Sequence, residues 1–258
     1  MCFDLDSQPP VQPVIGSDAR GEELTLTSAD GTPFAVYYAQ ADSVRRNGAG
    51  IVILPDVRGL YQFYKDLALR FAEAGVDAIT IDYFGRTAGL TARDDAFEYM
   101  PHVQQTKQPQ IREDVAAAMA TLRGGPHAPR AIFTVGFCFG GANSYQQAAN
   151  HLGLAGVIGY YGSPTNPTRD GSPAPIARIA DFECPILGFF GGADQGIPAE
   201  QAHQFDEALT QVGIEHEIIV YPGAPHSFFD RKYEEFAKES EDSWNRALAF
   251  INAHTPQA

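Results

Sequence analysis

Residues 131–141 read AIFTVGFCFGG, and this stretch decides which fold the chain adopts. The continuous apolar run at residues 131–136 predicts a strand buried on both faces of a sheet, and residues 139–150 predict a helix. Between them lies Gly136-Phe137-Cys138-Phe139-Gly140, the G-x-C-x-G pattern of a sharp strand-to-helix turn, where side chains two places either side of the centre would collide. Such a turn presents Cys138 at the carboxyl end of its strand, either as a nucleophile or as a small apolar filler.

The segments on either side of this turn alternate between strands and helices. Asp30-Gly31 joins two alternating runs within residues 24–39 and predicts a β-hairpin. Buried strands are expected at residues 50–55, 76–82, 131–136, 155–162, 185–192 and 216–222, and helices at residues 61–74, 109–123, 139–150, 199–212 and around 244–251. This order predicts an α/β fold in which an eight-stranded, mostly parallel sheet carries helices on both faces.

The chain shows no internal repeat or linker that would divide it. Residues 1–20 are rich in Pro, Asp and Gly and are expected to form an extended N-terminal arm, whereas residues 21–258 are expected to form a single α/β domain. The segment between the sixth and seventh strands, residues 163–183, is too short and too rich in Pro and Gly for a large cap domain. We therefore expect any active site to be open.

The composition of the 258-residue chain excludes several classes of protein. Its net charge of −14 would repel a polyanion such as nucleic acid. Its first residues do not resemble a secretory signal, and no apolar run is long enough to cross a bilayer. The three cysteines, Cys2, Cys138 and Cys184, show no metal-ligand spacing. We expect a cytoplasmic protein, a monomer or small homo-oligomer, that needs no metal or cofactor and binds a small molecule rather than nucleic acid or membrane.

Two further side chains follow predicted strands at the same edge of the sheet as Cys138. Ligands of open α/β sheets bind at the carboxyl ends of the strands. Asp194 follows the seventh strand in GGADQGIP, and His226 follows the eighth in GAPHSF. The order nucleophile, acid, histidine is that of a hydrolase triad, although an Asp in such a loop also forms turns and a loop His is often simply solvated.

From about residue 20 to residue 250 the chain resembles the dienelactone hydrolase (carboxymethylenebutenolidase) family of the α/β-hydrolase fold. The resemblance rests on GFCFGG, GGADQGIP and GAPHSF, and it is supported by IDYFGR after the fourth strand and GYYG after the sixth. It implies a catalytic triad of Cys138, Asp194 and His226. It also implies that the backbone N–H groups of Val57 and Phe139 form the oxyanion hole.

The resemblance further implies substrate-binding residues, with two departures from the family pattern. Arg86 in IDYFGR matches an arginine that binds a substrate carboxylate. A second family arginine falls on Asp230, with Arg231 one place later, and a family glutamate near the thiol falls on Asp56. Tyr160 in GYYG is expected either to line an apolar wall of the site or to belong to the core.

Together these residues predict a hydrolase that cleaves small esters or lactones, some bearing a carboxylate, through a thioester on Cys138. The two departures keep a general carboxylesterase or thioesterase open as an alternative. A second alternative, from another class, is a ligand-binding protein that keeps the hydrolase scaffold without turnover. Loss of a triad residue would indicate such a protein, and all three are present.

Overall fold

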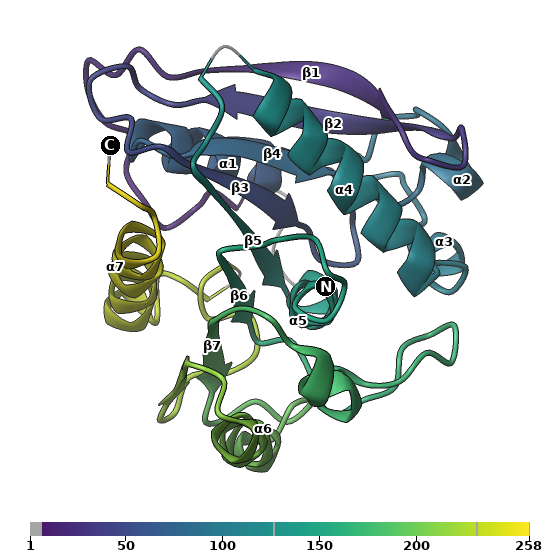
Figure 1. Cartoon of the computed structure of the whole chain (residues 1–258), viewed down its shortest axis with the longest axis vertical. Coiled ribbons are helices and arrows are strands. Elements are labelled where there is room, and N and C mark those ends of the chain that lie inside the picture. The colour runs from purple at the N-terminus through teal and green to yellow at the C-terminus, as the bar shows by residue number, and fades with distance from the viewer. Residues whose placement is uncertain (1–6, 126, 231, 258) are drawn as a thin grey trace.

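The computed structural model describes residues 7–125, 127–230 and 232–257, and it contains one eight-stranded sheet (Figure 1). The strands are β1 (Arg20–Thr27), β2 (Pro33–Gln40), β3 (Ala49–Leu54), β4 (Asp77–Ile81), β5 (Ala131–Phe137), β6 (Gly156–Tyr160), β7 (Ile186–Gly191) and β8 (His216–Tyr221). Their order in space is β1-β2-β4-β3-β5-β6-β7-β8. The β1–β2 and β2–β4 pairs are antiparallel, and every other pair is parallel. The carboxyl ends of β3 to β8 therefore share one edge.

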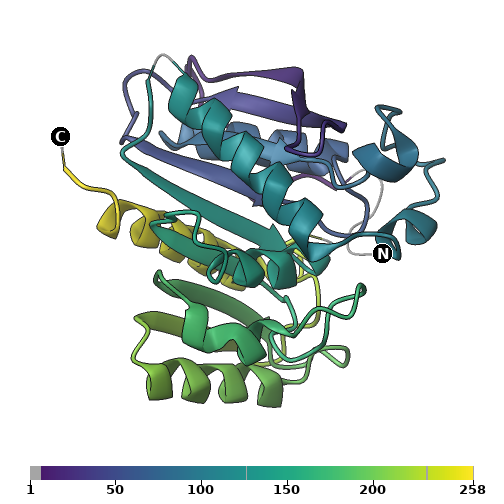
Figure 2. The ribbon, with the colours of Figure 1, turned by 45° about the vertical axis from the view of Figure 1, so that its right-hand side comes forward.

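Helices cover both faces of this sheet. They are α1 (Gln62–Glu73), α2 (Gly85–Ala88), α3 (Met100–Val103), α4 (Gln108–Gly124), α5 (Phe139–Gln147), the 3-10 helix η1 (Pro175–Asp181), α6 (Ala199–Val212) and α7 (Ala237–Ala253). Apolar side chains of α1 and α7 pack on one face. Those of α4, α5 and α6 pack on the other, where α4 lies across the front of the strands (Figure 1 and Figure 2).

The two-sided cover explains why the parallel strands are continuously apolar. All six residues of β3 are buried. Ile51 and Ile53 contact the cluster formed with α1 and α7, whereas Val52 and Leu54 contact the cluster formed with α4. Successive side chains of a strand point to opposite faces, so a strand with helices on both sides has no polar face.

The predicted sheet of eight mostly parallel strands with helices on both faces is confirmed. The short segments α2, α3 and η1 were not predicted, because each is too short to show a helical period in the sequence. The sixth strand is shorter than residues 155–162 and ends at Tyr160. It ends there because Tyr161 has a φ of 37°, which an extended strand does not tolerate.

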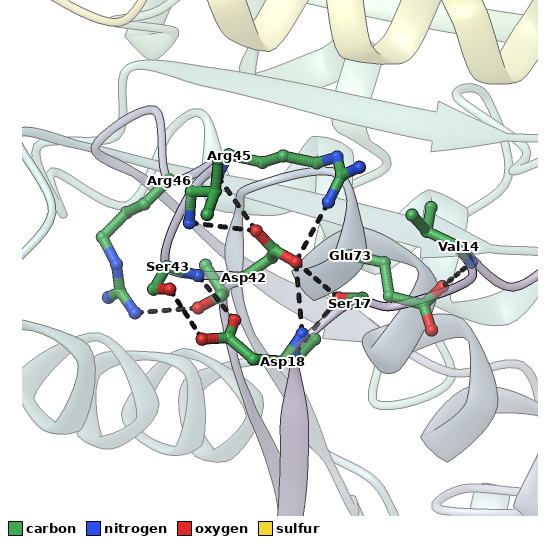
Figure 3. Close-up of polar contacts among 11 residues, drawn as sticks. Val14, Ser17, Asp18, Asp42, Ser43, Arg45, Arg46 and Glu73 are labelled. Atoms are coloured by element: carbon green, nitrogen blue, oxygen red, sulfur yellow. Dashed lines mark hydrogen bonds and ion pairs between the residues drawn. The ribbon is translucent and has the colours of Figure 1, made fainter.

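The segment before β1 contains neither helix nor strand over residues 7–19 and is held to the domain by polar contacts (Figure 3). Ser17 Oγ donates to Asp42 Oδ2 at 2.8 Å, and this bond, together with backbone N–H donors, lowers the pKa of Asp42 to about 2. Ser43 donates to Asp18 through its N–H at 2.7 Å and its hydroxyl at 2.6 Å. The N–H of Val14 reaches the carboxylate of Glu73. Residues 14–18 of the arm are therefore tied to the loop after β2 and the end of α1.

Three structural observations bear on membranes, metals and thiols. No helix in the described part of the chain is long and apolar enough to span a bilayer. Over the same residues, no group of three or more His, Cys, Asp or Glu side chains gathers as metal ligands would. Cys184 is buried next to β7, and burial raises the pKa of its thiol to about 12, so this side chain behaves as a small apolar residue of the core.

Candidate active site

The turn at Cys138 has the backbone geometry of a nucleophile elbow. Cys138 has φ 54° and ψ −114°, a conformation that side-chain-bearing residues rarely adopt. Its N–H donates to the carbonyl oxygen of Tyr160 at 3.0 Å, which joins the end of β5 to β6. α5 begins at the next residue, so unpaired N–H groups and the positive end of the helix dipole lie at Cys138. Cys138 itself is half-buried.

Close backbone approaches explain the glycines around this elbow. A Cβ added to Gly136 would lie 1.9 Å from the carbonyl oxygen of Gly140, and one added to Gly140 would lie 2.0 Å from that of Leu54. A Cβ on Gly141 would lie 2.6 Å from the carbonyl oxygen of Tyr160. The predicted collision of side chains at positions 136 and 140 is confirmed. The absence of side chains lets α5 start directly against β3 and β6.

The loops after β7 and β8 bring Asp194 and His226 together. His226 Nδ1 donates to Asp194 Oδ2 at 2.6 Å, and the N–H groups of Gly196 and Ile197 donate to Asp194 Oδ1 at 2.8 Å and 3.0 Å. Burial by itself would raise the pKa of Asp194, but the hydrogen bond and charge of His226, with the two N–H donors, outweigh it and lower that pKa. The ionised carboxylate fixes the ring and its tautomer, which leaves Nε2 as the nitrogen that can accept a proton.

β6 links the elbow to the histidine. The carbonyl of Tyr160 holds the N–H of Cys138, and the ring of the following residue, Tyr161, lies 5.0 Å from the imidazole of His226 between centroids. Cys138, Asp194 and His226 thus follow β5, β7 and β8 at one edge of the sheet, around the end of β6.

The loop after β3 lies against the first turn of α5. The carbonyls of Leu54 and Pro55 are the atoms that a Cβ on Gly140 would meet, and Asp56 and Val57 follow immediately. Asp56 is fully buried, and its Oδ1 accepts the N–H of Arg58 at 2.8 Å, so this carboxylate shapes its own loop. Val57 and Phe139 pack against the same apolar cluster. Residues on two chain segments therefore flank the elbow, where an oxyanion hole needs its N–H donors.

Arg86 lies in α2 and is held by a network of protein side chains. Its Nη1 and Nη2 donate to both oxygens of Asp114 at 2.8 Å and 3.0 Å, its Nε donates to Asp30 at 2.7 Å, and Nη2 also donates to Ser28. Only 12% of its side chain is exposed. Burial raises the pKa of Asp114, and the contact with Arg86 opposes that rise. Every guanidinium nitrogen of Arg86 already donates to a protein group. A substrate carboxylate would have to compete with these contacts, and its binding by Arg86 stays a prediction.

The structure places the other predicted substrate contacts as follows. Tyr160 is 1% exposed and its ring stacks 4.7 Å from that of Phe137, a position that favours the core alternative for this side chain. Asp230, at the position of the second family arginine, is fully buried and accepts a 2.6 Å hydrogen bond from the hydroxyl of Tyr161. Arg231 lies outside the described residues.

A buried ion pair after β4 was not predicted from the sequence. Arg93 donates to both oxygens of Asp82 at 3.1 Å and 2.8 Å, and its guanidinium lies 4.5 Å from the ring centroid of Phe97. The pair fixes the loop between α2 and α3, which borders the site edge. The only available signal was an arginine among acidic residues in a loop, and such a pattern is far more common on solvated surfaces.

Comparison with known proteins assigns the scaffold. Residues 34–255 match the family model described as "Dienelactone hydrolase family". A provisionally named carboxymethylenebutenolidase of Methylorubrum extorquens is 28% identical over 252 residues, which cover 95% of this chain and 86% of the relative. A Bradyrhizobium protein named as a probable 2-oxo-3-(5-oxofuran-2-ylidene)propanoate lactonase is 28% identical over 211 residues, covering 79% of this chain and 83% of the relative.

Solved structures agree on the fold. The crystal structure of a provisionally titled dienelactone hydrolase from Klebsiella pneumoniae superposes with a TM-score of 0.78 at 23% identity, and the match covers 90% of this chain and 98% of that one. The fold is therefore that of the dienelactone hydrolase-like α/β hydrolases.

Proposed function

As the chain belongs to the dienelactone hydrolase family, a family of hydrolases of lactone and ester bonds, we propose that it opens small esters or lactones by covalent catalysis at Cys138. The main support for the proposal is the hydrogen bond between His226 and Asp194. It orients a ring nitrogen as general base and acid at the sheet edge where a strained turn presents a cysteine.

In the proposed first half-reaction Nε2 of His226 accepts the thiol proton of Cys138, and the sulfur attacks the substrate carbonyl carbon. An S–C bond forms, and the carbonyl electron pair moves to oxygen, where the N–H groups of Val57 and Phe139 receive it. One such donor contributes about 2.7–4 kcal/mol to transition-state stabilisation in other hydrolases. The tetrahedral intermediate expels the alkoxide, which takes its proton from Nε2 of His226, and a thioester remains on Cys138.

In the second half-reaction water replaces the alcohol. His226 accepts a proton from water as the water oxygen attacks the thioester carbon. The C–S bond then breaks, its electron pair stays on sulfur, and the carboxylic acid departs. The imidazolium returns its proton to the sulfur, which restores the starting state. Asp194, ionised because its pKa is lowered, stabilises the imidazolium formed in each half. Sulfur expels the amine of a stable amide poorly, so esters, lactones and thioesters are the favoured substrates.

A general carboxylesterase or thioesterase is the second candidate, and one observation favours it. Where the family has a second arginine for the substrate anion, this chain has Asp230, and that carboxylate is bonded to Tyr161. In favour of the first candidate, the name of the Bradyrhizobium relative describes a lactone that also bears a propanoate group.

Hydrolysis of a small panel tests the proposal. The panel compares a carboxylate-bearing lactone, p-nitrophenyl acetate and a short acyl-thioester, using wild type, Cys138→Ala and Cys138→Ser. We expect wild-type turnover, a mass increase equal to one acyl group on Cys138 after rapid quenching, and no turnover by Cys138→Ala at an unchanged melting temperature. Full activity of Cys138→Ala would refute the nucleophile assignment. Ligand binding without turnover by wild type would identify the non-catalytic binding protein instead.

A further inference from the structure

A cavity of about 260 Å³ opens beside the elbow, between the start of α4, one face of α5 and the loop that joins β6 to β7. Phe139, Ala142, Asn143 and Gln146 line it from α5, at the spacing of a single helix face. Phe139 is the residue next to Cys138. Asn143 lies four residues after Phe139, about 6 Å along the axis at ~1.5 Å per residue. The cavity therefore extends from the residue next to the elbow to Asn143.

The polar wall of this cavity has hydrogen-bonding groups to spare. Asn143 is 2% exposed, and its Oδ1 accepts a bond from Gln108 Nε2 at 2.6 Å. Asn143 Nδ2 and Gln108 Oε1 have no hydrogen-bond partner among the described residues. Turning both amides end for end would keep the contact and would still leave one NH2 group and one carbonyl oxygen unused. Buried donors are nearly always satisfied by protein, water or ligand, so the unused NH2 is available to an acceptor that enters the cavity.

The lining of the cavity also includes an exposed cation that the protein does not neutralise. Arg169 is the one charged side chain in its lining, and within the described ranges it makes no ion pair or hydrogen bond. The next residue holds the loop in place: Asp170 Oδ2 accepts the N–H of Gln108 at 2.8 Å, and its Oδ1 accepts the N–H of Ser172 at 3.1 Å. An unpaired arginine is thus presented to a cavity without lining carboxylates, in a chain whose net charge is −14.

We propose that this cavity is the subsite for a carboxylate on the substrate, with Arg169 as its cation and the amide of Asn143 as a second donor. A guanidinium fork and an adjacent NH2 group supply several donors, which is what two carboxylate oxygens require. The inference rests on the proposed ester or lactone hydrolysis, and it places recognition of the anion on the β6–β7 loop rather than on Arg86.

Matched ester pairs test the proposal. For the acyl half, the mono-4-nitrophenyl ester of glutaric acid is compared with 4-nitrophenyl pentanoate. For the leaving group, 4-acetoxybenzoate is compared with 4-acetoxybenzamide. Arg169→Met should lower kcat/KM for the charged member of one pair by roughly 10- to 100-fold, the range for a lost charge-assisted contact, and change its neutral partner little. The pair that responds identifies which half of the substrate occupies the cavity.

Two further variants make the result specific. Arg123→Met removes an exposed arginine from the far end of α4 and should leave every rate unchanged. Asn143→Asp keeps an oxygen for Gln108 but puts a carboxylate where the spare NH2 was, and it should depress the charged esters selectively. Equal losses on charged and neutral esters, or no loss in Arg169→Met, would overturn the proposal.

Equilibrium binding separates this inference from the proposed function. Calorimetric titration of glutarate and 4-hydroxybenzoate into wild type and Arg169→Met needs no turnover. Weaker binding to Arg169→Met would support the subsite even if wild type hydrolysed none of the esters, in which case only the proposed function would fail. Equal binding of both anions to the two proteins would overturn the subsite, whatever the activity.

Discussion

The elbow at the end of β5 and the Arg86 network at the end of β4 lie on either side of β3, and they are built in opposite ways. At the elbow, backbone contacts set the geometry: Cys138 has φ 54°, and a Cβ on Gly140 would lie 2.0 Å from a carbonyl oxygen of β3. At α2, side chains set it, because Arg86 is held by Asp114 and Asp30 and has 12% of its side chain exposed.

The difference separates a group that is available from one that is already engaged. Arg86 can bind a substrate carboxylate only after giving up contacts with protein carboxylates, one of them on the buried Asp114. The side chain of Cys138 gives up no such contact, because backbone contacts at the surrounding glycines, rather than contacts of the cysteine side chain, hold its turn in place. A position after a strand therefore indicates a possible role, and the partners of the side chain decide it.

The largest effect is expected from adding a methyl group at the elbow. Gly140→Ala places a Cβ within 2.3 Å of two carbonyl oxygens, those of Leu54 and Pro55, neither of which can rotate away. We expect a loss of roughly 3 kcal/mol or more in the free energy of unfolding, with loss of turnover. Gly124→Ala is the matched control, because its Cβ meets nothing within 4 Å and a helix tolerates alanine well. A wild-type denaturation midpoint for Gly140→Ala would show that the elbow is not fixed by its backbone.

The next largest effect is expected at Arg86, and it should be on stability. Arg86→Met leaves the carboxylate of Asp114 buried without its bidentate partner, and burial already raises the pKa of that carboxyl. Removing one member of a buried pair costs about 3–5 kcal/mol, and we expect a loss of that size in the free energy of unfolding when it is measured by urea denaturation. The preference for charged over neutral esters should stay unchanged.

A double variant separates the two possible roles of this arginine. Arg86→Met with Asp114→Leu removes both charges and should recover most of the lost stability, since apolar replacements of buried pairs are often neutral. If Arg86→Met instead left stability intact and selectively raised KM for charged esters, the substrate-binding role implied by the family resemblance would be correct. The contrast between the elbow and the network would then fail.

The spacing of apolar residues and the positions of glycine and proline were enough to predict most of the fold from the sequence. The helix at residues 199–212 is observed at those limits, and the strand predicted at residues 216–222 ends one residue earlier. The glycine spacing at Gly136 and Gly140 predicted the elbow, because the constraint is local and steric. Short helices such as α2 were missed, because four residues show no period.

The partners of polar side chains were not predictable in the same way. Arg86 and Arg93 both lie in the segment after β4, and nothing in the sequence indicates that Asp114 and Asp82 neutralise them. Arg169 gave no signal at all, since a loop arginine is usually solvated. Which cation faces a cavity depends on contacts between residues far apart in the chain, and these follow from tertiary packing rather than from a local pattern.

A smaller effect is expected where the end of β6 supports the histidine. Tyr161→Phe removes the hydroxyl that donates to the fully buried carboxylate of Asp230 but keeps the ring against His226. A hydrogen bond to a charged group contributes about 1.5–3 kcal/mol, so we expect a stability loss in that range by denaturation. Since the ring remains, kcat should fall less than tenfold. A large loss of kcat without loss of stability would show that the hydroxyl acts in the reaction, and Tyr161 would then join Cys138, Asp194 and His226 as a catalytic residue.

The smallest effect is a pH dependence that originates at Asp194. Although burial opposes it, hydrogen bonds from His226, Ile197 and Gly196 hold the pKa of Asp194 below its ordinary value in the folded state. A carboxyl whose pKa is lowered by folding adds stability that is complete above the unfolded value of about 3.9 and is lost as pH falls through the folded value. The stability gap between wild type and Asp194→Asn should therefore be constant from neutral pH down to about pH 5 and shrink in stronger acid. A gap that widened in acid would mean that folding raises this pKa, and Asp194 would then not be the fixed negative charge on which the orientation of His226 depends.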